Sequence, residues 1–411
     1  LKQVLLQESI SGQPPVGGPS PTVNLSRLKA LKFRHDRESD PDGLQSVFGQ
    51  VFCQLEAFLD QPEALRGRDR AWRVNFAGEG GSDYGGLYRE CISNLCEDLQ
   101  SDYLPLLLPS PNMEHGLINR DKWIINPGAR SPRHMRMFEF LGILIGMSIQ
   151  TNYTLNVDFP SVTWKILLKE KLVPQDLFFF DTAAFNYLDA IRKFQPSEED
   201  PQESFPEEFF TVRLSSGEEV ELIENGASVR VTLENHLEYV KLAMRKRMHE
   251  SQEQIDAIRL GLSKIIPIEP LLIFTWEELE ELVCGKPDIP TGVLMQNTVF
   301  EGMAEEDDFI PMFWNVLESF SPSERSGFLR FVWGRSRLPS SSSKLSESMR
   351  VSILRVETPD DYHPVSHTCF FSVEVPRYSS PDIMRQKFLY AINNCIAIDA
   401  DFSSDRSEWN T

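Results

Sequence analysis

The stretch PVSHTCFFSVEVPRY, residues 364–378, decides how the C-terminal part of the chain folds. Its second half alternates apolar and polar side chains, a pattern that predicts a half-buried strand. Cys369 stands just before that strand, next to Thr368 and after a turn marked by Pro364. One interpretation of a thiol in such a turn is that it is presented to a partner rather than buried. The rival interpretation is a core thiol, because free cysteines are usually buried.

Length and charge set limits on the kind of protein. At 411 residues the chain is too long for one small core, so two or more globular units are expected. The 61 acidic against 41 basic residues give a formal net charge of -20. This excess argues against a nucleic-acid partner, which requires clustered lysine and arginine. It suits a basic protein partner, although solubility alone is the alternative explanation for most of the acids.

The six cysteines contain no C-x-x-C pair, so we expect no metal site. We interpret them as reduced thiols of a cytoplasmic protein that is also a candidate for the nucleus. The glycine-rich run 78–86 lacks the Lys-Ser/Thr ending of a phosphate loop, so we expect a structural turn and no nucleotide or other cofactor. Core positions are predicted for Cys53, Cys91, Cys96, Cys284 and Cys395.

No secretory signal or membrane span is predicted. The most apolar stretch, residues 137–149, contains Glu139 and is too short to cross a bilayer. The chain begins with Leu1 rather than Met, which we interpret as the C-terminal part of a longer protein.

Periodicity predicts most of the secondary structure. Helices are expected over 46–58, 87–98, 134–150, 161–171, 181–194, 232–250, 276–284, 310–320, 323–333 and 381–394. Strands are expected over 71–76 and 350–355, and a hairpin over 210–214 and 219–223 around the turn 215–217.

Local signals refine these helices. Gly142 and Gly146 lie four residues apart on one helix face, which would let another element approach closely. Ser161 and Thr232 are predicted N-caps, because a hydroxyl can accept a free backbone N–H. The sequence TWEE, residues 275–278, is a capping-box pattern. Four basic residues are expected on the outer face of the 232–250 helix: Lys241, Arg245, Lys246 and Arg247.

Several ordered motifs resemble the HECT family of ubiquitin ligases, from about Asn24 to Asp401. The cysteine run is similar to the family's cysteine site almost residue for residue. AWRVNFAGEGGSDYGGLYRE at 71–90 resembles the strand, loop and helix that open the large lobe, and FEFLGILIG at 138–146, after Asn126 and Pro127, resembles its central helix. VTLENHLEY at 231–239 resembles another family segment, and Phe313-Trp314 with FVWGRSRLP at 331–339 resembles the entry to the small lobe. The very large HERC-type and related giant members are the most similar in character.

The resemblance implies a bilobal α+β fold. Its segments would be a flexible lead-in over 1–23, a mainly helical N-lobe over 24–300, a hinge at the acidic break 301–308, and an α/β C-lobe over 309–411. The N-lobe would carry a small insert at about 197–262 that binds an E2 ubiquitin-conjugating enzyme. Cys369 would accept ubiquitin as a glycyl thioester and pass it to a lysine of a protein substrate, with no cofactor or metal.

The resemblance also suggests supporting residues. On a strand, His367 and Cys369 would share a face, so His367 is a candidate for proton transfer, against the alternative of a surface or turn histidine. Thr368 is a candidate for fixing the loop or bonding near the thioester, against a purely structural role. A carboxylate near the thioester would help to deprotonate the lysine amine, and the candidates are Asp360, Asp361 and Glu408. Aromatic anchors for E2 are sought among Phe205, Phe209, Phe210 and Tyr239, whereas Phe178, Phe179 and Phe180 are expected in the core.

Two departures from the family keep other functions open. SSSSKLSES at 340–348 replaces the Gly-Phe element that commonly follows the small-lobe entry, and Trp409 is out of register with a phenylalanine that many relatives place near the C-terminus. These departures motivate a catalytically impaired module that binds E2 or ubiquitin without transfer. A cysteine hydrolase is the third hypothesis, but it requires an orienting His and Asn or Asp around the thiol, and only His367 is near in sequence.

Overall fold

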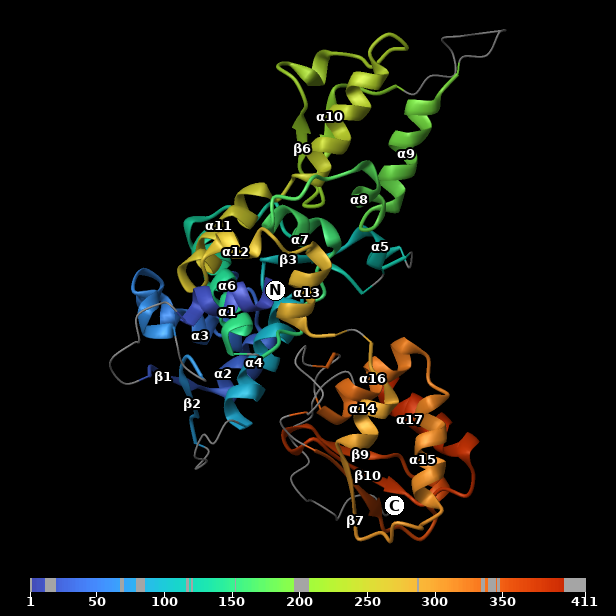
Figure 1. Ribbon diagram of the computed structural model, residues 1–411. Coiled ribbons are helices and arrows are strands. Elements are labelled where there is room, and N and C mark those ends of the chain that lie inside the picture. Colours follow the sequence, from blue (N-terminus) through green and yellow to red (C-terminus); the bar gives the residue numbers. More distant parts are fainter. Residues whose placement is uncertain are drawn as a thin grey trace. The chain divides into compact units, whose positions relative to one another are not determined.

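The chain forms two compact units, Leu1–Val283 and Cys284–Thr411, which are described separately. This computed structural model describes residues 2–11, 20–66, 70–78, 86–115, 118–119, 121–151, 153–195, 207–286, 288–333, 337–338, 345 and 348–394. Helices and small sheets both occur in it, so the fold is of the mixed α+β class (Figure 1).

The first unit is mainly helical. Its helices are α1 Lys2–Ser11, α2 Arg27–His35, α3 Val47–Leu55, α4 Gly86–Leu99, α5 Pro111–Glu114, α6 Pro132–Thr151, α7 Ser161–Leu167, α8 Pro174–Phe178, α9 Thr182–Lys193, α10 His236–Met248, α11 Gln252–Ile265, α12 Ile268–Leu271 and α13 Trp276–Cys284, with 3-10 turns η1 Glu56–Asp60, η2 Pro62–Leu65 and η3 Gly226–Ser228. Its strand pairs are parallel β1 Thr22–Leu25 with β2 Arg73–Phe76, antiparallel β3 Leu107–Pro109 with β4 Trp123–Ile125, and antiparallel β5 Thr211–Arg213 with β6 Glu219–Glu221.

Helices α6 and α11 form the centre of this unit. A Cβ added to Gly142 would lie 1.9 Å from the carbonyl oxygen of Ile258, and one added to Gly261 would lie 1.8 Å from that of Glu139. Gly146 approaches the side chain of Ile265 in the same way. The predicted close approach at Gly142 and Gly146 is therefore confirmed, and the approaching element is α11.

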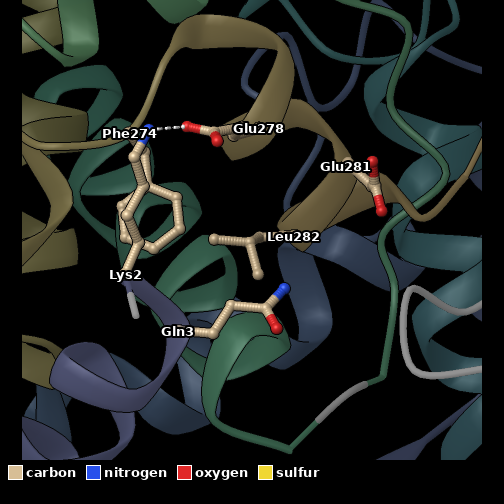
Figure 2. A pocket seen from close by; sticks show the side chains of 6 residues that line it. All are labelled: Lys2, Gln3, Phe274, Glu278, Glu281 and Leu282. Carbon is tan, nitrogen blue, oxygen red and sulfur yellow. Dashed lines mark hydrogen bonds and ion pairs between the residues drawn. The ribbon is translucent and has the colours of Figure 1, made fainter.

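The N-terminal residues correct one prediction. Residues 2–11 form helix α1 and residues 22–23 belong to β1, whereas a flexible lead-in was predicted over 1–23; residues 12–19 lie outside the described residues. Leu6 is buried, and the Nζ atom of Lys2 lies 2.6 Å from a carboxylate oxygen of Glu278. This pair lines a cavity of about 340 Å³ beside α1 and α13. Figure 2 shows the side chains that line it. Packing of α1 against distant parts of the chain explains why residues 2–11 are ordered. The glycine and proline content of a segment carries no information about such packing.

Two predicted N-caps are wrong, and one capping box is confirmed. Ser161 is the first residue of α7 rather than its cap, which is Pro160. Thr232 does not cap α10, whose N-cap position is Asn235. The residues after Thr232 first form a turn, in which the Thr232 N–H donates to the Asn235 side chain at 2.7 Å. At the start of α13, the Thr275 N–H donates to Glu278 at 2.8 Å and the Glu278 N–H to Thr275 at 3.4 Å.

The second unit packs helices on one mixed sheet. Its strands are β7 Thr298–Glu301, β8 Met349–Leu354, β9 Val365–His367 and β10 Ser372–Pro376, in the order β7-β8-β10-β9. Strands β7, β8 and β10 are parallel to one another, and β9 is antiparallel to β10. Its helices are α14 Thr291–Gln296, α15 Phe309–Glu318, α16 Pro322–Trp333 and α17 Pro381–Asn394, with 3-10 turns η4 Pro359–Asp361 and η5 Thr368–Phe370.

The boundary between the units lies before residue 300, where the first domain was predicted to end. Strand β7 belongs to the second unit because it pairs with β8, and the Phe300 ring lies 5.8 Å from that of Phe313 in α15. The predicted hinge, residues 301–308, therefore lies inside this unit. Within it, Asp307 accepts two hydrogen bonds from the Arg377 guanidinium, at 2.9 and 2.6 Å. Movement at this segment remains a prediction.

Candidate functional site

Cys369 lies in the 3-10 turn η5, which joins β9 to β10. This placement fits the expectation of a turn just before an alternating strand, because β10 buries Val373 and Val375 while Ser372 and Glu374 are partly exposed. The side chain of Cys369 lies outside what the structure describes. Its role therefore rests on the loop that carries it and on the sequence around it.

The C-terminal end of this loop is fixed by Phe371. Its backbone has φ 47° and ψ 52°, in the left-handed region that a bulky residue rarely adopts. Its ring is fully buried and stacks on Trp333 of α16, with centroids 4.2 Å apart. Its carbonyl oxygen accepts a 2.9 Å hydrogen bond from the Arg350 N–H of β8. Packing and this hydrogen bond together offset the backbone strain and hold the turn against the sheet.

The surface on either side of Cys369 in the sequence exposes apolar side chains. Phe370 is 72% exposed and Val365 is 44% exposed. Tyr362 and Tyr390 are also exposed, and the Tyr390 ring stacks on His363 with centroids 4.4 Å apart. An exposed phenylalanine directly after a candidate nucleophile is unusual for a solvated loop and is typical of a protein-binding surface. These residues were missed from the sequence because apolar anchors were predicted only for the E2-binding insert.

His367 is the last residue of β9, and its Nε2 atom lies 3.2 Å from a carboxylate oxygen of Glu374 on β10. Both side chains are exposed. The argument that His367 and Cys369 share one face of a strand is wrong, because the chain leaves the strand at His367 and continues as a 3-10 turn. Thr368 begins that turn, and its carbonyl oxygen accepts a 3.4 Å hydrogen bond from the Phe371 N–H. The catalytic roles of His367 and Thr368 remain predictions.

The carboxylate candidates differ in their surroundings. Asp360 accepts hydrogen bonds from the Ser379 N–H at 2.9 Å and the Ser379 hydroxyl at 2.6 Å. These bonds hold the pKa of Asp360 below its ordinary value and tie the β8–β9 connection to the start of α17. Asp361 is exposed. Glu408 lies outside the described residues, as do Trp409, Cys395 and most of the run 340–348.

The predicted E2-binding insert, about residues 197–262, contains the β5–β6 hairpin, α10 and most of α11. Helix α9 precedes it, and we call residues 182–248, which comprise α9, the hairpin and α10, the docking segment. Phe209 is 43% exposed there, whereas Phe210 and Tyr239 are buried against each other with ring centroids 5.7 Å apart. Phe205 lies outside the described residues. The predicted hairpin is confirmed, with Val212 opposite Val220.

Other exposed apolar side chains of this region were missed from the sequence. Tyr187 of α9 and Leu237 of α10 are 43% and 59% exposed. The predicted burial of the Phe178–Phe180 run holds for Phe180 but not for Phe179, which is 42% exposed. A helical stripe predicts which residues share a face, but it does not tell which of two apolar faces meets the core.

Of the four other cysteines that the structure describes, three follow their predictions and one does not. Cys91, Cys96 and Cys284 are buried, but Cys53 of α3 is exposed. Residues Val51, Phe52 and Leu55 take the buried positions of that helix instead. Among the residues that the structure describes, no three side chains gather as metal ligands would. Within the same residues, no helix combines the length and apolar composition that crossing a membrane needs.

The sequence matches the model of the HECT-domain (ubiquitin-transferase) family over residues 93–399. The chain belongs to the HECT family. The matched residues include η5 with Cys369, both flanking strands and α17. The sequence-based recognition of the family is thereby confirmed.

Large ubiquitin ligases are similar to this HECT domain. The E3 ubiquitin-protein ligase HERC2 of Mus musculus and that of Homo sapiens are each 39% identical over 386 residues, which is 93% of this chain and 8% of theirs. The E3 ubiquitin-protein ligase HUWE1 of Mus musculus is 30% identical over 385 residues, 90% of this chain and 8% of its own. The chain thus spans less than a tenth of the length of these relatives.

Proposed function

We propose that this HECT domain accepts ubiquitin from an E2 enzyme as a thioester on Cys369 and transfers it to a lysine of a protein substrate. The family match over residues 93–399 carries the proposal, because it includes the whole cysteine loop. The relatives' names support it, since they are called E3 ubiquitin-protein ligases. We assign the first unit to the N-lobe and the second to the C-lobe of a bilobal arrangement.

The chemistry consists of two acyl transfers. In the first, the Cys369 thiolate attacks the carbonyl carbon of the E2–ubiquitin thioester, and the E2 thiolate leaves. In the second, a lysine amine attacks the new thioester, an amide bond forms, the Cys369 thiolate leaves, and the amine proton passes to a base or to water. A free thiol has a pKa of about 8.5, so a minor thiolate fraction is present at neutral pH.

The loop geometry supports this chemistry. Phe371 and Trp333 anchor one side of η5, while Phe370 on the other side points its ring into solvent. A rigid support beneath a reactive turn reduces the conformational freedom lost on reaction. Exposed Phe370 and Val365 offer apolar contact to the ubiquitin that must be carried there. The reduced thiols that the mechanism requires fit a cytoplasmic or nuclear location, which is part of the proposal.

We place E2 on the docking segment. Phe209, Tyr187 and Leu237 expose apolar surface there, and such side chains serve as anchors when a partner buries them. The excess of acidic over basic residues in the chain favours association with basic partner surfaces.

A non-reducing gel tests the proposal. The protein is incubated with E1, E2, ubiquitin and ATP, and the expected product is an adduct that thiols release and that Cys369→Ala lacks. Cys53→Ala is the matched control, since the Cys53 thiol is exposed and its removal should leave the adduct intact. An adduct that persists in Cys369→Ala refutes the assignment of the residue. Binding of E2 or ubiquitin with no adduct, under conditions where another HECT ligase reacts, supports the impaired binding module instead.

A further inference from the structure

One buried arginine joins the docking segment to the rest of the first unit. Arg247 near the end of α10 has a side chain only 7% exposed, although its neighbours Arg245 and Lys246 are exposed. The prediction that Arg247 lies on the outer face of this helix is therefore wrong. Its charge is accommodated inside the protein by two carboxylates.

The guanidinium contacts three separate parts of the chain. Its Nη2 atom lies 2.8 Å from a carboxylate oxygen of Asp181, and its Nε atom lies 2.9 Å from one of Glu250. The same Nη2 atom donates to the hydroxyl of Ser215 at 3.0 Å. The Ser215 N–H in turn donates to Glu250 at 3.1 Å, so Arg247, Ser215 and Glu250 are each bonded to the other two.

These partners stand where the chain passes between the docking segment and the core. Asp181 is the N-cap of α9 and accepts a 2.9 Å hydrogen bond from the Ala184 N–H. Ser215 begins the turn of the β5–β6 hairpin. Glu250 lies between α10 and α11, and the next residue, Ser251, donates its hydroxyl to the Ile125 carbonyl oxygen of β4 at 2.6 Å. Figure 1 shows α9, β6 and α10 grouped together in this region.

A buried ion pair is a poor source of net stability, because desolvation of the charges offsets most of their attraction. It does fix geometry, since a planar guanidinium accepts its partners only in a narrow range of directions. Three chain segments that meet at one guanidinium therefore have one favoured arrangement.

From this geometry we propose that Arg247 is a positioning residue that sets the orientation of the docking segment relative to α6 and α11, and so the presentation of E2. The inference rests on the proposed function, since it concerns the E2 complex. Arg247 touches no reacting atom. Loss of its contacts should weaken productive E2 binding and leave the chemistry at Cys369 unchanged.

The test compares Arg247→Met with Arg245→Met, which removes an exposed arginine from the same helix. Initial rates of thioester formation are measured against the concentration of ubiquitin-charged E2. We expect KM for Arg247→Met to rise roughly tenfold, equivalent to losing about one good interface contact, with kcat little changed. Arg245→Met should keep the KM of the wild type. Arg247→Lys should lie between Arg247→Met and wild type, because a lysine keeps the charge but not the forked geometry.

Two further measurements separate positioning from a general loss of structure. After loading at saturating E2 and removal of Mg²⁺ to stop E1, discharge of the thioester onto free lysine should proceed at the wild-type rate. Hydrogen exchange should increase in the hairpin and at the start of α9, while α6 and α11 keep their protection. If Arg247→Met does not fold, Ser215→Ala removes one hydrogen bond of the set and should raise KM a few-fold.

An unchanged KM with unchanged hydrogen exchange would overturn the inference, and so would an equal loss in the discharge step. Failure of the wild type to form any thioester would instead refute the proposed function. The two failures are therefore distinguishable.

Discussion

Trp333 at the end of α16 and Phe371 before β10 stack with their ring planes inclined by only 9°. Both side chains belong to the hydrophobic core of the second unit. Phe371 follows the turn that contains Cys369, so the core of this unit extends to a residue only two positions along the sequence from the candidate nucleophile. Stability of the core and presentation of the thiol are linked at this residue.

Phe371→Ala should therefore destabilise the second unit by about 3–5 kcal/mol, the usual cost of truncating a buried phenylalanine. The free energy of unfolding from urea denaturation is the measurement. Phe370→Ala is the matched control, because that ring is 72% exposed and its removal should change stability by less than about 0.5 kcal/mol. Equal losses for the two variants would contradict the anchoring role of Phe371.

Gly142→Ala should disrupt the packing of α6 on α11. The added Cβ would lie 1.9 Å from the Ile258 carbonyl oxygen, and backbone cannot move aside as a side chain can. We expect a loss of at least about 1–3 kcal/mol by overpacking, measured by chemical denaturation. Gly292→Ala is the control, because no atom lies within 4 Å of a Cβ built there, and it should be neutral or slightly stabilising. A Gly142→Ala variant as stable as wild type would mean that the helices are further apart.

Local signals in the sequence predicted local structure well. The capping box of Thr275 and Glu278 involves residues three apart, and the glycines of α6 mark a close contact by themselves. Ser161 and Thr232 failed as caps because several polar residues and prolines compete near each helix start, and tertiary packing selects among them. Helix α1 was missed because its order comes from contacts with the distant helices α12 and α13.

The part of the site that lies within one continuous run of sequence was predictable. The turn at Cys369 and the strand after it follow from one short run. The Trp333–Phe371 stack and the Arg247 contacts join residues far apart in the chain, and periodicity carries no information about such pairs. Arg247 illustrates the reason, since helical spacing places it among exposed bases, whereas its contacts with Asp181, Glu250 and Ser215 make its burial favourable.

The ion pair of Asp307 and Arg377 predicts a dependence of stability on pH. The hydrogen bonds from Arg377 lower the pKa of Asp307 from 3.8 to about 2. An acid with a lowered folded-state pKa stabilises the fold above its unfolded pKa, and this contribution is lost as pH falls from about 4 to 2. The Tm difference between wild type and Asp307→Asn should be constant above about pH 5 and shrink below pH 4. A difference that grows toward acid pH would contradict the pairing.

Thiol labelling tests the burial of the cysteines. Iodoacetamide should modify Cys53 in the native protein, although partial desolvation and Glu56 raise the pKa of its thiol and slow the reaction. Cys91, Cys96 and Cys284 should stay unmodified until the protein is unfolded, and burial raises the pKa of Cys96 to about 12. Mass mapping of native and unfolded samples gives the pattern. Rapid native labelling of Cys96 would contradict the packing of α4.

The most direct test of the account is the chemical nature of the bond at residue 369. Cys369→Ser replaces the thiol by a hydroxyl, so any ubiquitin accepted there forms an oxygen ester, which thiols do not cleave. With E1, E2, ubiquitin and ATP, we expect a thiol-sensitive adduct for the wild type and a slower, thiol-resistant adduct for Cys369→Ser, with ubiquitin mapped to residue 369 by mass spectrometry. An adduct that stays thiol-sensitive in Cys369→Ser, or maps to another cysteine, would contradict it.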